Sequence, residues 1–163
     1  MGESERVGAA FFQSFHAVML NDLGVVLPAL VSGNDLPGFT EAWDDHLAAV
    51  AVHTVMEEGV EGVGLGAIAM LDHYLGGVLG LARFAAEHAQ ESVAQAAVTA
   101  AIERGAISLE CALGTYQAMV EDHLKHEEAV IVPLVARLPP PGSRNSAIGA
   151  WPRAWPMGGS SIL

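Results

Sequence analysis

Two histidine–glutamate pairs in the sequence could bind metal ions. His53 is followed four residues later by Glu57, and His123 is followed four residues later by Glu127. In both stretches a second acid comes next, so they share the pattern His-x-x-x-Glu-Glu. Residues four apart in an α-helix lie on nearly the same face, so an imidazole and a carboxylate would point to one place. A single pair of this kind is common on surface helices, but its repetition indicates a shared site.

Apolar residues at three- and four-residue intervals predict the helices that carry these pairs. Thr40 is expected to cap the second helix, and the glycine-rich stretch 59–66 is expected to connect it to the third. Residues 88–104 are rich in alanine, and they either extend the third helix or form a separate one that Gly105 stops. The predicted helices cover about residues 5–31, 40–57, 67 onward and 107–137.

The composition predicts one helical domain and excludes several classes of function. The chain has 163 residues, of which 52% are hydrophobic and 16% charged, enough for one sizeable core. Its net charge of −12 would repel nucleic acid and an anionic membrane. The single cysteine, Cys111, excludes an internal disulfide. Without a signal peptide or an uninterrupted apolar run of about 20 residues, we expect a cytoplasmic protein outside the membrane.

Two further histidines extend the pattern into a pseudo-repeat. His16 lies on the apolar stripe of the first helix, and His73 lies on the third. Residues 5–60 and 67–137 would then each supply one inward histidine and one His-x-x-x-Glu-Glu helix. We therefore expect an all-α fold, an antiparallel up-and-down four-helix bundle with room for a short extra helix. This bundle is assigned to residues 1–137, and residues 138–163 to an irregular Pro/Gly-rich tail.

Six of these side chains would meet in the core of such a bundle, and they would need partners there. A buried polar group without a partner destabilises a protein by roughly 1–3 kcal/mol. Two metal ions bridged by two carboxylates would supply those partners. Imidazole and carboxylate without thiolate favour iron, manganese or zinc over copper(I). The predicted metal ligands are His16, His53, Glu57, His73, His123 and Glu127.

The order of these motifs resembles the hemerythrin-like (HHE cation-binding) family over roughly residues 10–137. The match is best from His123 through Glu127 and Glu128 to Pro133. The resemblance implies two iron ions joined by an oxo or hydroxo group and by Glu57 and Glu127. In this arrangement His16 and His53 would bind one iron, and His73 and His123 the other. Members of the family bind dioxygen, sense oxygen or iron, or react with peroxide or nitric oxide.

The sequence departs from the oxygen carriers of that family in two places. The position one turn after His73, where the carriers have a second histidine, is Gly77. On the fourth helix Glu127 lies four residues after His123, whereas the carriers have an acid five residues after. Fewer ligands leave room for water, peroxide or a small-molecule substrate, which favours an oxidase or a peroxide-decomposing enzyme. The alternatives are an oxygen or iron sensor or carrier without turnover, and a metal-free structural module.

Five other residues could support the metal site or add a ligand to it. His46 and Tyr116 each precede a predicted ligand histidine by seven residues, roughly 10 Å along the helix axis. Each of them either lines the core or acts on the metal site. His88 would lie too far from His73 for one site if the third helix were continuous. The remaining three candidates for the metal site are His126, Glu58 and Glu128.

The tail, with Trp151 and Trp155, is expected to pack on the bundle or on a second copy in a homodimer.

Overall fold

The computed structural model of the chain describes residues 13–60 and 64–135. Nearly all of these residues are helical, and the rest include one two-stranded hairpin, so the all-α prediction is confirmed. The predicted C-terminal tail and its boundary with the helical region lie outside the described residues.

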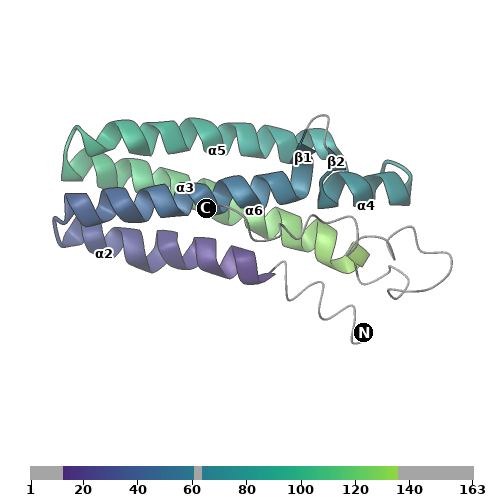
Figure 1. Cartoon of the computed structure of the whole chain (residues 1–163), viewed down its shortest axis with the longest axis horizontal. Coiled ribbons are helices and arrows are strands. Elements are labelled where there is room, and N and C mark those ends of the chain that lie inside the picture. The colour runs from purple at the N-terminus through teal and green to yellow at the C-terminus, as the bar shows by residue number, and fades with distance from the viewer. Residues whose placement is uncertain (1–12, 61–63, 136–163) are drawn as a thin grey trace, which may run out of the picture.

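Short turns join the first long helix to the second and the third to the fourth, whereas a hairpin and a short helix lie between the second and the third (Figure 1). A helix over Gln13–Ser32 contains a π-helical turn, η1 (Asp22–Val26), and ends with α2 (Leu27–Ser32). In the hairpin, Gly59 pairs with Leu65 and Val60 with Gly64 in antiparallel register. The other elements are α3 (Leu36–Glu58), β1 (Gly59–Val60), β2 (Gly64–Leu65), α4 (Ala67–Leu75), α5 (Leu81–Ile102) and α6 (Ala106–Val135).

Four long helices run alongside one another, and α4 lies at one end of them (Figure 1). The helix that ends in α2 contacts α3 and α6, and α5 also contacts α3 and α6. Each long helix therefore packs against two others, and their inner faces enclose a common interior. The short α4 packs against α3 and α5.

The second long helix begins earlier than the sequence predicted. Asp35 caps α3, because its side chain accepts a hydrogen bond from the backbone N–H of Gly38 at 3.0 Å. Pro37 suits the first turn, where its missing N–H is not needed. Thr40 is therefore not the cap; its hydroxyl donates to the carbonyl of Leu36 inside the helix.

A glycine-rich break separates α4 from α5, so residues 88–104 do not continue the helix of His73. Gly76, Gly77 and Gly80 have φ angles of 82°, 84° and 67°, in the left-handed region that glycine adopts without strain. The chain turns there and begins α5 at Leu81. The third long helix is therefore α5, and α4 is the short extra helix.

The apolar core consists of two clusters with a polar layer between them. The larger cluster includes Val50, Ala94, Val120 and Leu124, and the smaller one joins Phe84, Ile131 and residues of α4. Along α5 and α6, the buried histidines and glutamates lie between residues of the two clusters. Apolar side chains therefore cover the polar layer at both ends.

The helix over Gln13–Ser32 is long and apolar enough to cross a membrane by length and composition, alone among the described helices. Core helices of soluble proteins meet the same criteria. Its inner face packs in the larger cluster through Met19, Leu23 and Leu27. Absence of a membrane partner stays a prediction, as does the cytoplasmic location.

Candidate metal centre

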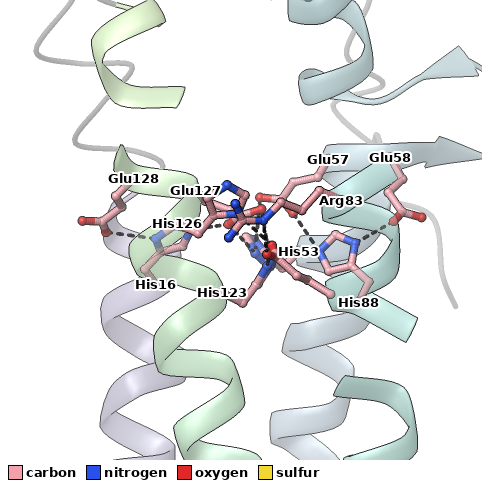
Figure 2. Close-up of polar contacts among 11 residues, drawn as sticks. His16, His53, Glu57, Glu58, Arg83, His88, His123, His126, Glu127 and Glu128 are labelled. Atoms are coloured by element: carbon pink, nitrogen blue, oxygen red, sulfur yellow. Dashed lines mark hydrogen bonds and ion pairs between the residues drawn. The ribbon is translucent and has the colours of Figure 1, made fainter. Parts of the chain in front are cut away.

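Six buried side chains from the four long helices converge in the polar layer (Figure 2). Each of them is at most 7% exposed to solvent. One residue comes from the first helix, two from α3, one from α5 and two from α6. They are His16, His53, Glu57, His88, His123 and Glu127.

These residues form two groups that share both carboxylates. One group joins His16 and His53 to Glu57 and Glu127, and the other joins His88 and His123 to the same two acids. Within each group, one ligand atom per residue lies within 4.8 Å of every other. The imidazole rings of each histidine pair meet edge to face, with centroids 5.2 Å apart in the first pair and 4.7 Å in the second.

Glu57 directs its two oxygens toward different histidine pairs. Its Oε1 lies 3.3 Å from Nε2 of His53, and its Oε2 lies 3.3 Å from Nε2 of His88. Each histidine pair therefore has one oxygen of Glu57 close to it.

Glu127 is arranged in the same way. Its Oε2 lies 3.4 Å from Nε2 of His16 and 3.6 Å from that of His53, and its Oε1 lies 3.3 Å from Nε2 of His123. Two ligands at adjacent positions around a metal ion with bonds of about 2.1 Å lie about 3.0–3.4 Å apart. The observed spacing therefore fits coordination by both acids.

Several of these facing atoms lack hydrogen bonds. All four carboxylate oxygens of Glu57 and Glu127, and Nε2 of His88 and His123, are buried without a hydrogen-bond partner among the described residues. Buried polar atoms in native proteins nearly always have a partner. A cation between them would supply one, so the residues present fit a metal site.

Outer carboxylates orient the imidazoles of His16, His88 and His123. Nδ1 of His16 lies 3.0 Å from Oε1 of Glu128, and Nδ1 of His88 lies 2.6 Å from Oε1 of Glu58. Such a contact favours the tautomer with hydrogen on Nδ1, which leaves the Nε2 lone pair facing the cluster. Glu58 and Glu128, two of the additional candidates in the sequence, therefore lie outside the cluster and hydrogen-bond to its histidines.

Glu87 of α5 does the same for the third imidazole, and the sequence did not single it out. Its Oε2 accepts from Nδ1 of His123 at 3.1 Å and from Nδ1 of His126 at 2.9 Å. Arg83 donates to its other oxygen at 2.9 Å. His126 also stacks on Phe84, with ring centroids 4.8 Å apart. His126 therefore contacts the acid that orients His123, and it belongs to neither group of candidate ligands.

His73 is not part of the cluster, contrary to the sequence prediction. It is exposed on α4, whose buried residues are Ile68 and Leu71. His88 takes its place, because α5 begins after the glycine break and places His88 on the inner face. The prediction that His88 has no role at the site assumed one continuous helix, and that helix does not exist. Gly77, where the carriers have a histidine, lies in the break.

His46 and Tyr116 are both buried, and they pair with each other at a distance from the cluster. Nε2 of His46 lies 3.2 Å from the hydroxyl of Tyr116, and Nδ1 lies 3.3 Å from Oδ2 of Asp22. The side-chain amide of Gln95 donates to the same hydroxyl at 3.2 Å. Neither His46 nor Tyr116 belongs to either group of candidate ligands.

Glu91 is a further buried acid that the sequence analysis did not select. It is 4% exposed, and its Oε1 has no hydrogen-bond partner among the described residues. Burial raises the pKa of Glu91 to about 7, although the nearby His88 opposes the rise. Its distance of three residues from His88 could have suggested one shared helix face.

The two shared acids differ in their tendency to ionise. Burial raises the pKa of Glu57 to about 9, and the charge of Glu127 adds to the rise against the effect of His88. Burial disfavours ionised Glu127 too, but the imidazoles of His16 and His53 outweigh it and lower the pKa. Without cations, only one of the two acids ionises readily near neutral pH.

The two histidines of the second pair also differ in how readily they bind a proton. Burial lowers the pKa of His123, which favours the neutral form that binds metal. Burial also acts to lower the pKa of His88, but contacts with Glu57 and Glu58 raise it to about 9. A metal ion would therefore have to displace a proton from His88.

No protein-family model, curated protein or solved structure matches the chain. The resemblance to hemerythrin-like proteins therefore remains a prediction from the sequence motifs. What the structure contributes is a set of buried histidines and glutamates that could hold metal ions.

Proposed function

We propose that this protein is a hemerythrin-like protein with two non-haem iron ions that reacts with dioxygen, peroxide or nitric oxide. His16 and His53 would bind one ion, His88 and His123 the other, and Glu57 and Glu127 would bridge them. The observation that carries the proposal is that each acid presents one oxygen to each histidine pair. A site for a single ion would not need this division.

The proposed architecture is an antiparallel up-and-down four-helix bundle. The contacts of the helix that ends in α2 with α3 and α6, and of α5 with the same two helices, support it. So do the short turns before α3 and before α6, which are typical of antiparallel neighbours in this topology. In this arrangement α4 and the hairpin close one end of the bundle.

The protein would hold the ions in a dry, prearranged site. The apolar clusters on both sides exclude water, and Glu58, Glu87 and Glu128 hold the imidazoles in position by hydrogen bonds. Iron, when bound, would supply the one-electron chemistry and the open coordination positions that small oxidants need. Two imidazoles and a share of two carboxylates make a small ligand set, which favours reaction over simple carriage. We therefore place the protein with oxidases or peroxide-decomposing enzymes.

Metal analysis of the purified protein tests the proposal. We expect two iron ions per chain, with manganese or zinc as substitutes, and absorption bands from an oxo or hydroxo bridge. His123→Ala should reduce the metal content, whereas the exposed His73→Ala should not. A protein that binds no metal under any loading condition would be the metal-free structural module instead.

Oxygen uptake and peroxide consumption separate an enzyme from a sensor or carrier. The proposed enzyme consumes peroxide or dioxygen through many turnovers, and His123→Ala abolishes this activity. A carrier would bind oxygen reversibly without net consumption. A sensor would change its spectrum or its partner binding without turnover.

A further inference from the structure

Tyr116 and His46 are not ligands of the proposed metal site. Their groups are nevertheless arranged as in a site where a base activates a hydroxyl. Both residues are 0% exposed, and Nε2 of His46 lies 3.2 Å from the phenol oxygen. Asp22 lies 3.3 Å from the other ring nitrogen. A carboxylate, an imidazole and a hydroxyl in this order are the parts that catalytic triads use to draw a proton from the hydroxyl.

The hydrogen-bond pattern around Tyr116 directs its proton to His46. The amide of Gln95 donates to the phenol oxygen at 3.2 Å, so the phenol hydrogen is left to donate elsewhere. His46 can accept it at Nε2 when Nδ1 carries the hydrogen that faces Asp22. Burial lowers the pKa of His46, against the effect of Asp22, and burial raises the pKa of Tyr116. A neutral phenol therefore donates to a neutral imidazole.

The pair lies close enough to the proposed metal centre to exchange electrons with it. Tyr116 precedes His123 on α6 by seven residues, and His46 precedes His53 on α3 by the same number. Two turns of helix correspond to roughly 10 Å. On α5, Gln95 lies seven residues after His88, so the two share one helix face, and the amide of Gln95 donates to the phenol of Tyr116. One face of α5 therefore runs from the cluster to the phenol.

We propose that Tyr116 is a redox-active residue that supplies one electron to the metal centre when peroxide has oxidised it. The phenol loses one electron to the metal centre, and its O–H proton moves to Nε2 of His46. The products are a neutral phenoxyl radical and an imidazolium that faces Asp22. Peroxide is the oxidant consumed: it would take two electrons and two protons, its O–O bond would break to give two water molecules, and the phenol would replace one of the two electrons drawn from the bound ions. This inference rests on the proposed iron-binding function.

Transfer of the proton is what makes the oxidation feasible in this environment. A phenol that lost only an electron would become a cation in an apolar interior, which burial strongly disfavours. When the proton moves to His46, the positive charge lies beside the carboxylate of Asp22, whose side chain is 26% exposed. The charge is therefore placed where an acid and solvent can stabilise it.

Electron paramagnetic resonance of the iron-loaded full chain, frozen after addition of hydrogen peroxide, tests the proposal. The sequence contains only two tyrosines, and Tyr74, which is 39% exposed on α4, is the matched control. We expect a free-radical signal in the unaltered protein and in Tyr74→Phe, and its loss in Tyr116→Phe. His46→Gln should lower the radical yield at unchanged iron content, because it removes the proton acceptor.

Ring-deuterated tyrosine incorporated into the unaltered protein gives a second test that needs no variant. The signal should narrow if the radical is on tyrosine, and an unchanged signal would overturn the proposal. A signal that persists in Tyr116→Phe would assign it elsewhere, for example to Trp43, whose ring lies 5.4 Å from that of Tyr116. Iron content and absorption measured on the same samples separate the two failures. Absent iron contradicts the proposed function, whereas bound, peroxide-oxidised iron without a tyrosine radical contradicts this inference alone.

Discussion

His88 of α5 and Glu57 of α3 face each other across the interior, with Nε2 of the imidazole 3.3 Å from Oε2 of the carboxylate. Glu58, the next residue of α3, lies 2.6 Å from the other ring nitrogen. Two successive acids of one helix thus contact opposite sides of one imidazole. This arrangement explains why the His-x-x-x-Glu-Glu pattern has a doubled acid on α3, where the first acid faces the cluster and the second orients a histidine.

Replacing His88 should remove one half of the metal site. We expect His88→Ala to bind about half as much metal as the unaltered protein, because its group loses an imidazole while the group of His16 and His53 is intact. Elemental analysis after metal loading and gel filtration measures this. His73→Ala is the control and should bind metal normally. The opposite pattern, with loss only in His73→Ala, would contradict the assignment of His88.

Removing an outer carboxylate should weaken metal binding without abolishing it. Glu58→Ala and Glu128→Ala should each lower metal affinity about 10–100-fold, because the imidazole loses the partner that fixes its orientation. Competition with a chromophoric chelator for Zn²⁺ or Mn²⁺ measures the affinity. Glu110→Ala, at an exposed position of α6, is the control for loss of one negative charge. Equal weakening in all three variants would indicate a general effect of charge.

The metal-free protein should lose stability as the pH rises from 6.5 to 9. The pKa of His88 in the folded protein is about 9 against an ordinary value of 6.5, and that of Glu57 is about 9 against 4.5. In this interval the folded protein holds more protons than the unfolded chain, so the free energy of unfolding falls with pH. Glu127 has the opposite shift, but its contribution is complete above its ordinary value of 4.5.

Bound metal should reverse this trend, because binding displaces the same protons and therefore strengthens with pH. Urea unfolding at pH 6.5 and 9, with chelator or with added Zn²⁺, measures both effects. We expect the difference in free energy of unfolding between the two conditions to be larger at pH 9. A metal-free protein that is more stable at pH 9 than at pH 6.5 would show that the pKa values of His88 and Glu57 are not raised in the folded protein.

Gly66, which lies between β2 and α4, should be far less tolerant of a methyl group than Gly64, two residues earlier in β2. A Cβ at Gly66 would collide with the backbone carbonyl of Glu57 and the nitrogen of Gly59, whereas a Cβ at Gly64 meets nothing within 4 Å. We expect Gly66→Ala to lower the free energy of unfolding by about 2 kcal/mol or more, and Gly64→Ala to change it by less than about 0.5 kcal/mol.

Urea unfolding of the metal-free variants checks this difference. Metal affinity should also fall in Gly66→Ala, because the collision is with the last turn of α3, which carries Glu57. Equal stability of the two variants would show that the backbone at Gly66 does not pack tightly against the end of α3.

The long helices and their inner faces could be predicted from the sequence. The period of 3.6 residues places Trp43, His46, Val50, His53 and Glu57 on one face of α3, and all five are buried. The corresponding stripe of α6, from Leu109 through His123 and Glu127 to Ile131, is buried as well. A helix face depends only on spacing along one chain segment, so local sequence is sufficient information.

Two of the supporting acids, Glu87 and Asp22, could not be predicted in this way, unlike Glu58 and Glu128, which follow the ligand glutamates directly. Glu87 reaches His123 across the contact between α5 and α6, and Asp22 reaches His46 across another helix pair. No spacing rule relates these residues, which are 36 and 24 positions apart. Only the packing of helices brings them together.

Spacing along the chain identified five of the six candidate ligands, the helices that carry them, and the inward direction of the two His-x-x-x-Glu pairs. Which histidine of the third segment joins them depends on tertiary packing. Local periodicity allows both His73 and His88 to face inward, but three glycines in left-handed conformation end α4 and restart the chain as α5. The direction of a helix after such a break depends on the surfaces against which it packs, and these belong to distant parts of the chain.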